Sequence, residues 1–405
     1  MRIKQCRNCK SKKLITLFSL GNLCFTGKFS SLNDNIKKKP VTVVLCKSCE
    51  LVQLAHNYDL KYLYGPDYGY RTGINRTMTD HVKKITQTLA KKTSLKKNDL
   101  VLDIASNDGT LLNSYKKNII KFGVDPILNK YKKNYKNIRY SISGFFSASK
   151  VKEKTKKKFK IISALSVFYD LLNPNKFLRD VKTLLLPEGV FLLEFADLAS
   201  IIKYKMFDTI CHEHLEYYSS KVIINLVKKN DLRVFDIKQN FINGSSKQYY
   251  ICHKNSKIKS KSKIINKTLR SESKLKLNTV KTFKEFIQKI NFLKTRLNNK
   301  IKYIRRNNQS IHCYGASTKG NVLLQYFNID NKKISFAAER NKNKYGLVTP
   351  GSKIKIISEE NSRKMKPDYY LVLPWHFKKE ILKREKNTLR TGTKFIFPLP
   401  NFEII

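Results

Sequence analysis

A short stretch near the middle of the chain concentrates side chains that can move protons near neutral pH. Residues 207–219 hold two of the seven histidines, His212 and His214, together with Glu213 and two tyrosines. Imidazoles and carboxylates are the groups that most often serve as general acids and bases. The stretch therefore predicts acid–base chemistry, provided that the flanking elements bind a substrate.

Two pairs of cysteines near the N-terminus have the spacing of a zinc site. Each Cys-x-x-Cys unit places two thiolates on one tight turn, and two such turns complete a tetrahedral shell of four sulfurs. Because that shell has no open position, the ion would be structural. We predict a structural Zn²⁺ bound by Cys6, Cys9, Cys46 and Cys49.

The segment 100–112 predicts the first strand, turn and helix of a nucleotide-binding α/β sheet. Its turn has Ala105 and Ser106 where a dinucleotide site has Gly-x-Gly-x-x-Gly, and Asp103 would repel a phosphate but suits a cationic sulfonium. S-adenosylmethionine therefore fits better than NAD. Asp125 ends the next strand and is placed to accept hydrogen bonds from ribose hydroxyls. The predicted cofactor-binding residues are Asp103, Ala105, Ser106, Asn107, Asp108, Gly109, Thr110, Asp125, Pro126, Ala164 and Leu165.

Further elements continue this pattern towards the histidine-rich stretch. We expect a helix at 77–92, a strand at 160–165, a helix at 175–186, a turn at 186–189 and a strand at 190–195. A helix at 222–229 and strands at 232–237 and 248–253 follow. The stretch comes shortly after the strand at 190–195, whose carboxyl end would open onto the cofactor.

The last hundred residues predict a second α/β lobe. Residues 311–320 read as a strand, a glycine-rich loop and a helix start, where exposed N–H groups beside Lys319 favour an anion. Strands are expected at 334–339, which ends in an acid, and at 369–373. Residues 254–280 read as a linker or a solvated helix start, and a long amphipathic helix follows from 280 to 304. With S-adenosylmethionine in the first lobe, the second suggests a nucleotide-bearing substrate.

Length and composition set the outer limits. A chain of 405 residues with 41% hydrophobic residues should hold two or three domains. The net charge of +52 raises nucleic acid as a partner, but lysine is spread along the whole chain in short runs, as on solvated surfaces. A polyanionic small substrate would benefit from the same field. No membrane span or signal peptide is expected, which places the protein in the cytoplasm.

Taken together, the motifs resemble the sugar C-methyltransferases that act on nucleotide-linked 4-keto-deoxyhexoses. The resemblance covers essentially the whole chain and rests on the cysteine pairs, on 102–110, on 208–214, on 315–320 and on 373–377. It implies a zinc-binding domain at 1–72, a class I Rossmann-like methyltransferase domain at 73–253, and a linker, long helix and C-terminal Rossmann-like α/β substrate-binding domain at 254–405. Three positions depart from the family pattern: Cys211 stands where Tyr is common, Ala105 where Gly is common and Gln248 where Arg is common.

The resemblance also implies roles for residues. Glu213 and His214 occupy the acid–base positions, and Tyr68 and Tyr70 lie on a loop that reaches the sugar. The full set of expected substrate-binding residues is Tyr68, Tyr70, Ser245, Ser317, Lys319, Glu339, Trp375 and His376.

The predicted activity is S-adenosylmethionine-dependent methyl transfer to carbon in deoxysugar biosynthesis. Our hypothesis is that His214 removes a proton next to the sugar ketone, while Glu213 orients the imidazole or a ring hydroxyl. Alternatives are methylation of RNA or of another small keto substrate, and a non-catalytic zinc-containing binding protein. A metal site at His212 and His214 is a further alternative for the stretch itself.

Overall fold

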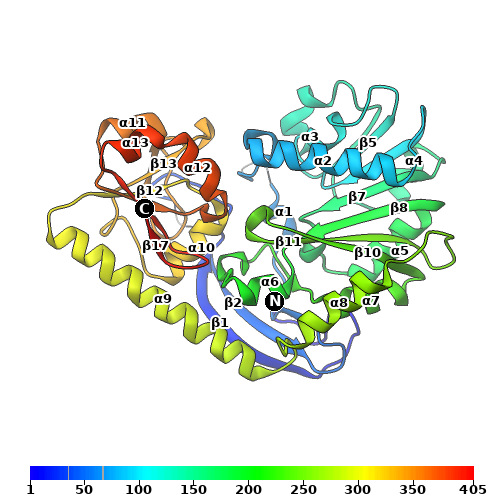
Figure 1. Ribbon diagram of the computed structural model, residues 1–405, viewed down its shortest axis with the longest axis horizontal. Coiled ribbons are helices and arrows are strands. Elements are labelled where there is room, and N and C mark those ends of the chain that lie inside the picture. Colours follow the sequence, from blue (N-terminus) through cyan, green and yellow to red (C-terminus); the bar gives the residue numbers. More distant parts are fainter. Residues whose placement is uncertain (35, 66–67) are drawn as a thin grey trace.

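Three β-sheets organise the chain in the computed structural model, which describes residues 1–34, 36–65 and 68–405 (Figure 1). The smallest sheet is antiparallel and lies between and below the two larger lobes. Its fourth strand comes from the histidine-rich stretch, far from the others in sequence, and pairs Val52 with Tyr217 and Gln53 with Glu216. In order across the sheet, the strands are β1 (Leu14–Cys24), β2 (Lys38–Cys46), β3 (Val52–Leu54) and β9 (Glu216–Tyr217).

The central sheet has seven strands in the order β10-β11-β8-β7-β4-β5-β6. Five neighbouring strands run parallel, and β11 runs antiparallel to both its neighbours. The carboxyl ends of the parallel strands therefore meet at one edge, where ligands bind in sheets of this kind. In chain order the strands are β4 (Leu100–Ile104), β5 (Ile120–Asp125), β6 (Tyr140–Ser143), β7 (Phe159–Leu165), β8 (Leu185–Phe195), β10 (Leu232–Asn240) and β11 (Ser246–His253).

Helices cover both faces of this sheet, and the longer helices α2, α5 and α7 bury one apolar stripe each. In α2, for example, the buried residues Met78, Val82, Ile85 and Leu89 recur at helical spacing. The helices of this part of the chain are α1 (Leu60–Leu63), α2 (Arg76–Lys92), α3 (Thr110–Asn113), α4 (Ala148–Lys154), α5 (Pro174–Leu184), α6 (Leu198–Lys203), α7 (Ser220–Lys229) and α8 (Ser262–Ser273).

The third sheet has five parallel strands and an antiparallel edge strand in the order β14-β13-β12-β15-β16-β17. Its strands are β12 (Ile311–Tyr314), β13 (Phe336–Glu339), β14 (Lys355–Ser358), β15 (Tyr369–Val372), β16 (Lys394–Phe397) and β17 (Glu403–Ile404). The accompanying helices are α9 (Val280–Arg306), α10 (Thr318–Tyr326), α11 (Glu359–Lys364), α12 (Lys378–Arg384) and α13 (Lys386–Arg390).

Helix α9 ties the C-terminal lobe to the small sheet. It runs along the bottom of the molecule from the central region to the far side of the C-terminal lobe (Figure 1). Near its start, Phe283 and Phe286 pack against Phe18 of β1, with ring centroids 6.3 and 5.9 Å apart. Such aromatic contacts and the buried stripe of α9 join the lobes through one continuous hydrophobic core.

Most of the expected elements are confirmed, and two differ in detail. Residues 254–280 were expected to be a linker or a solvated helix start, and 262–273 form a separate helix, α8, with mostly exposed side chains. Its buried residue Glu272 accepts hydrogen bonds from the backbone and hydroxyl of Ser220. The expected turn at 186–189 lies inside β8 as an irregularity, since pairing with β7 resumes at Val190 after a break beyond Leu185. Across the described ranges, every helix is too short or too polar to cross a bilayer.

Candidate active site and metal centre

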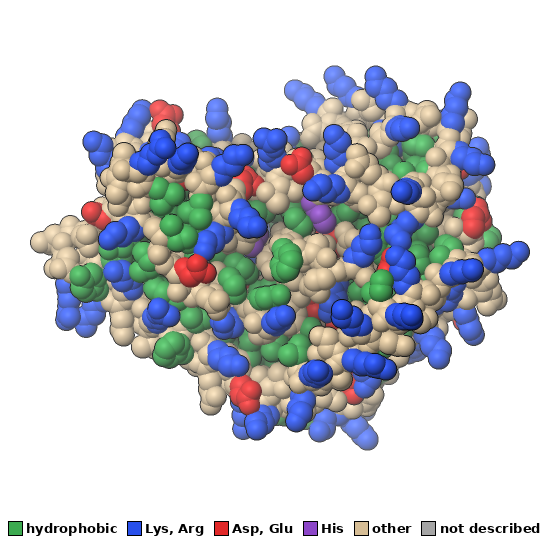
Figure 2. Space-filling view, viewed as in Figure 1, with side chains coloured by type: hydrophobic (Ala, Val, Ile, Leu, Met, Phe, Trp, Pro, Cys, Tyr) green, Lys and Arg blue, Asp and Glu red, His purple; other side chains and the backbone are tan. Residues whose placement is uncertain are grey.

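A cavity of about 400 Å³ lies where the carboxyl edge of the central sheet faces the C-terminal lobe. Its wall combines the ends of β4, β5 and β7 and the glycine-rich loop before α10. It also includes the loop before α2 that carries Tyr68 and Tyr70, called the tyrosine-rich loop below. In Figure 2 histidine side chains show in the hollow between the two larger lobes. One continuous space is therefore lined by the predicted cofactor lobe and the predicted substrate lobe.

Most of the predicted cofactor residues line the cavity. Those that do are Asp103, Ala105, Ser106, Asn107, Asp125, Pro126 and Leu165. Asp108, Gly109, Thr110 and Ala164 lie outside its wall. Asp108 instead accepts hydrogen bonds from Arg71 and from the backbone of Gly73. It therefore links the tyrosine-rich loop to the turn between β4 and α3. Asp125 accepts hydrogen bonds from the backbone N–H groups of Asn107 and Ile127, both at 2.8 Å, which shapes that turn.

Asp103 is the buried acid at this end of the cavity. Its carboxyl group accepts a hydrogen bond of 2.6 Å from the Ser163 hydroxyl. Burial raises the pKa of Asp103 to about 7, and the charge of Asp125 acts in the same direction. A buried carboxyl group with no cation paired to it among the described residues fits a positively charged ligand, as the sulfonium and ammonium groups of S-adenosylmethionine would be.

His214 lies in the cavity wall. Its Nδ1 lies 2.6 Å from the carbonyl oxygen of Thr209. Because a carbonyl only accepts, Nδ1 carries the proton and Nε2 keeps a free lone pair. Burial lowers the pKa of His214 to about 4, so the ring is neutral at pH 7. The Tyr169 ring packs against it with centroids 4.1 Å apart, which fixes its orientation.

Glu213 faces away from the cavity, towards the N-terminal lobe. Its carboxylate accepts hydrogen bonds from the Thr26 hydroxyl at 3.1 Å and from the Gly27 backbone N–H at 3.2 Å. Thr26 is held in turn, since its carbonyl accepts a hydrogen bond of 2.8 Å from Asn321 of α10. Glu213 does not line the cavity, so its position suits orienting the His214 segment better than touching a ring hydroxyl.

His212 points away from His214. Its Nε2 donates to the carbonyl oxygen of Lys39 at 3.0 Å, and its ring packs against Phe25 and Tyr58 with centroids 4.6 and 4.8 Å away. A metal ion shared by the two histidines is therefore not supported. Cys211 is buried in the apolar core, which raises the pKa of its thiol well above the usual range.

The predicted substrate residues divide into two groups. Tyr68, Tyr70, Ser317, Lys319, Glu339 and His376 line the cavity, whereas Ser245 and Trp375 do not. Ser245 is buried and bonds to Ser200 and Gln239. Trp375 donates its indole N–H to Asp208 at 2.8 Å and supports the wall from behind.

Two cavity-lining residues already have local roles. The Ser317 hydroxyl caps α10 by accepting from the Gly320 backbone N–H at 3.0 Å. The Glu339 carboxylate accepts backbone N–H groups of Ala316 and Asn341, each at 2.9 Å, and so holds the glycine-rich loop in shape.

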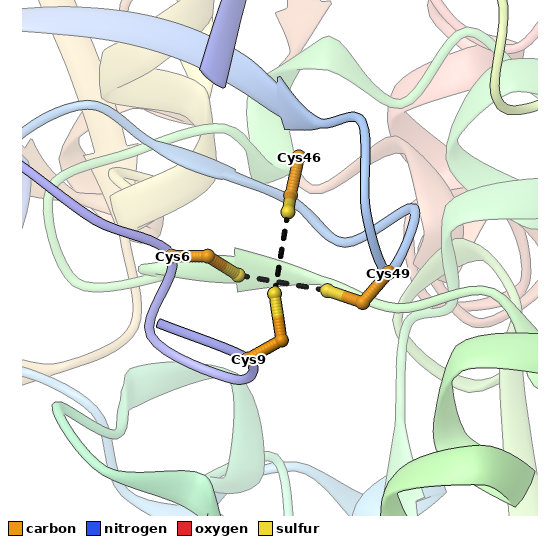
Figure 3. Close-up of side chains that lie close together, drawn as sticks. All are labelled: Cys6, Cys9, Cys46 and Cys49. Atoms are coloured by element: carbon orange, nitrogen blue, oxygen red, sulfur yellow. Dashed lines mark hydrogen bonds between the residues drawn. The ribbon is translucent and has the colours of Figure 1, made fainter. Parts of the chain in front are cut away.

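The four paired cysteines meet at one point, as Figure 3 shows. Their sulfurs lie within 4.8 Å of one another, with Cys6 and Cys49 3.6 Å apart and Cys9 and Cys46 3.5 Å apart. Sulfurs around a tetrahedral zinc ion with Zn–S bonds of about 2.3 Å are about 3.8 Å apart, so the arrangement fits that ion. Within the described ranges, no other group of His, Cys, Asp or Glu side chains meets the geometry of a metal site.

The metal site is linked to the acid–base stretch through Gln53 and Arg7. Gln53 of β3 donates to the Cys6 sulfur at 3.2 Å and accepts from Arg7. The buried Arg7 guanidinium then donates to the carbonyl oxygens of Leu54 and Leu215. Leu215 directly follows His214, so these contacts connect the N-terminal lobe to the histidine-rich stretch, residues 207–219.

Sequence reasoning missed several residues that shape the site. Thr26, Gly27 and Asn321 hold Glu213, and Tyr169 and Asp170 line the cavity beside His214. Asp170 is buried, and one of its carboxyl oxygens has no hydrogen-bond partner among the described residues. No motif marks these positions. Thr26 lies 187 residues from Glu213, so only the tertiary fold brings the two together.

Comparisons with known proteins agree with this architecture. Residues 6–64 match a domain family described as zinc binding, residues 74–237 match a methyltransferase domain, and residues 241–400 match a C-methyltransferase C-terminal domain. The chain is similar to the C-methyltransferase NovU of Streptomyces niveus, with 26% identity over 409 aligned positions that cover all of this chain and 97% of that protein.

Solved structures are similar over less than half of the chain. An S-adenosylmethionine-dependent methyltransferase from Clostridium acetobutylicum is 13% identical over 43% of this chain and 92% of its own, with a TM-score of 0.35. The plantazolicin methyltransferase BamL, solved with a triazolic desmethylPZN analogue and SAH, is 14% identical over 44% of this chain and 87% of its own, with a TM-score of 0.36.

Proposed function

The chain belongs to the S-adenosylmethionine-dependent C-methyltransferases that combine a zinc-binding, a methyltransferase and a C-terminal domain, and from this we propose that it methylates a carbon of a nucleotide-linked keto-deoxysugar. The observation that carries the proposal is the position of His214. Its free Nε2 lies in the wall of one cavity that the cofactor lobe and the C-terminal lobe both line. A neutral base at that junction suits removal of a proton from a substrate held between them.

The mechanism starts from His214. Its Nε2 accepts the proton on the carbon next to the ketone, which leaves that carbon nucleophilic as part of an enolate. When bound, S-adenosylmethionine supplies an electrophilic methyl group on its sulfonium. The two lobes would hold the nucleophilic carbon in line with this methyl group, and such positioning contributes much of the rate. Tyr68 and Tyr70 close the cavity from the loop side.

The nucleotide part of the substrate is assigned to the C-terminal lobe. The glycine-rich loop there lies in the cavity wall and leads into the N-terminus of α10. Backbone N–H groups at a helix N-terminus favour a phosphate-bearing ligand. In Figure 2 the Lys and Arg side chains spread over the whole of the face in view instead of gathering in one patch, so the net charge does not favour RNA as the substrate.

Incubation with a labelled cofactor tests the proposed function. The protein should transfer a deuterated methyl group from S-adenosylmethionine to at least one member of a panel of nucleotide-linked 4-keto-deoxysugars, as followed by mass spectrometry. The same sugars already reduced to alcohols at that position are the matched control and should not react, because they form no enolate. Equal labelling of ketones and alcohols would contradict the proposal.

Asp103 makes binding of the cofactor dependent on pH. Its pKa of about 7 means that half of the sites are protonated at neutral pH, and a cationic ligand selects the carboxylate form. Calorimetry should therefore show affinity for S-adenosylmethionine rising about tenfold per pH unit below pH 7 and levelling off above it. Asp103→Asn should bind more weakly at pH 8 and lose this dependence. An unchanged pH profile in that variant would exclude Asp103 as the responsible group.

Thr26 tests the orienting role of Glu213. Thr26→Val removes the hydroxyl that holds the carboxylate. Hydrogen bonds to charged groups contribute about 1.5–3 kcal/mol, so we expect kcat to fall roughly 10- to 100-fold while cofactor affinity stays unchanged. Thr26→Ser, which keeps the hydroxyl, should turn over at close to the wild-type rate. Thr42→Val is the control, since its hydroxyl meets only Ser19 on the exposed side of β2. A normal kcat in Thr26→Val would show that Glu213 needs no such support.

A further inference from the structure

Among the described cationic residues of the cavity wall, Lys319 stands out because it has no carboxylate partner. It is the second residue of α10, and its Nζ donates to the carbonyl oxygen of Asn243 at 3.0 Å. An ammonium group has three hydrogens, so two remain for other acceptors. Lys319 lines the cavity and is partly exposed to it.

The other cations at this end of the cavity are already neutralised. The Nζ of Lys344 lies 3.6 Å from Oε2 of Glu339. The guanidinium nitrogens of Arg340 and Arg384 lie 3.4 and 2.9 Å from carboxylate oxygens of Glu380 and Glu359, respectively. For Lys319, no carboxylate of the described residues lies within ion-pair distance. Its charge is therefore the one most open to an anionic oxygen of a bound substrate.

A buried carboxyl group, Asp208, acts on Lys319 through its charge. Asp208 is fully buried, and one of its oxygens accepts the indole N–H of Trp375 at 2.8 Å. Its other oxygen has no hydrogen-bond partner within the described part of the chain. Burial lowers the pKa of Lys319, and the charge of Asp208 opposes that change. The buried acid thus favours the ammonium form without blocking it.

Lys319 also shares its end of the cavity with the base. Burial is the main cause of the lowered pKa of His214 and of His376, and the positive charge of Lys319 adds to both shifts. All three side chains line the same cavity. Lys319 and His214 therefore interact electrostatically across the cavity that both side chains line.

We propose that Lys319 is a catalytic residue whose ammonium group stabilises the enolate oxygen formed when His214 removes the proton beside the substrate ketone. The assignment rests on the proposed function and supplies the oxyanion partner that the reaction needs. The C–H electron pair moves to the ketone oxygen, and the proton goes to Nε2 of His214. The pair then returns through carbon to form the C–CH₃ bond, while the C–S bond breaks onto sulfur and the carbonyl re-forms.

Exchange of the substrate proton with deuterium isolates this step. In D₂O the wild type, with S-adenosylhomocysteine bound, should exchange the proton next to the ketone of an accepted keto-sugar, as followed by NMR. Lys319→Gln should slow this exchange and kcat together by about 100- to 1,000-fold, the usual effect of removing an oxyanion donor. Lys319→Arg, which keeps the charge, should recover part of both rates. Calorimetry with S-adenosylmethionine checks that each variant is folded.

Lys333→Met is the control, because it removes a lysine of the same lobe that lies outside the cavity wall and donates to Oδ1 of Asn298 at 2.9 Å. It should keep exchange close to the wild-type rate at saturating substrate. If Lys319→Gln exchanges normally and only weakens binding of uridine or thymidine diphosphate, Lys319 is a phosphate anchor and the assignment is overturned. If the wild type neither exchanges nor methylates any keto-sugar, the proposed function itself fails, and the assignment fails with it.

Discussion

Replacing His214 with alanine is expected to abolish methyl transfer while leaving affinity for S-adenosylmethionine unchanged. The imidazole is the proposed base in the cavity wall, with Nδ1 bonded to the Thr209 carbonyl and Nε2 without a hydrogen-bond partner among the described residues. Loss of a general base costs about 100- to 10,000-fold in rate. Turnover and calorimetric binding should be measured on the same preparation.

His212→Asn is the matched control for this variant. His212 lies two residues away but faces Lys39 and the aromatic rings of the N-terminal lobe. Its replacement should lower the melting temperature more than the turnover. Comparable loss of kcat in both variants, with normal folding, would contradict the assignment of His214 as the base.

The pH profile gives an independent check on His214. Because burial lowers its pKa to about 4, the ring remains an unprotonated base well below neutral pH. The rate at saturating cofactor and substrate should therefore show no acid limb near pH 6.5, and the step due to His214 should appear near pH 4. A limb near the ordinary histidine pKa that disappears in His214→Ala would show that the ring is more exposed to water than the structure has it.

Removal of the metal is expected to cost both stability and activity. The N-terminal lobe has few elements of its own, and in small metal-bound domains the free energy of binding zinc, about 10–16 kcal/mol, is also free energy of folding. Because β9 pairs with β3 and Arg7 binds the Leu215 carbonyl, unfolding of this lobe would release Glu213 and His214. Cys46→Ser should therefore lower the melting temperature and abolish turnover.

The metal content and a second cysteine variant make this test specific. The wild type should contain one zinc ion per chain by atomic absorption, and Cys46→Ser should contain less. Cys252→Ser replaces an equally buried thiol outside the metal site and should cost only about 1–3 kcal/mol with zinc content unchanged. Full activity in zinc-free protein would refute the link between the metal site and the acid–base stretch.

The fold was predictable because its signals are local. The Cys-x-x-Cys spacings, the apolar strand ending in Asp103 and the stripe of α9 each lie within a few turns of chain, and the structure and the domain matches confirm the architecture that they indicate. Helix α8 was left open as a linker or a solvated helix start, because its contact between Glu272 and Ser220 depends on a partner 52 residues away.

The site was predictable only in part, for the same physical reason. A strand–turn–helix pattern indicates which residues end a strand, and these line the cavity, but it does not indicate where side chains farther along the helix or loop point. The Glu213 carboxylate accepts a hydrogen bond from Thr26, and the Trp375 indole donates one to Asp208. Ser245 is buried and hydrogen-bonded to Ser200. In the same way, β9 crosses the boundary expected at residue 72 by joining the N-terminal sheet.

The central claim, methyl transfer to carbon, is tested most directly by NMR of the product. The protein should be incubated with S-adenosylmethionine carrying a ¹³C-methyl group and with the keto-sugar that it labels. We predict that the new methyl carbon is bonded to the ring carbon next to the ketone, seen as a carbon–carbon correlation, and that His214→Ala gives none. A methyl signal on oxygen, or on a carbon not adjacent to the ketone, would contradict it.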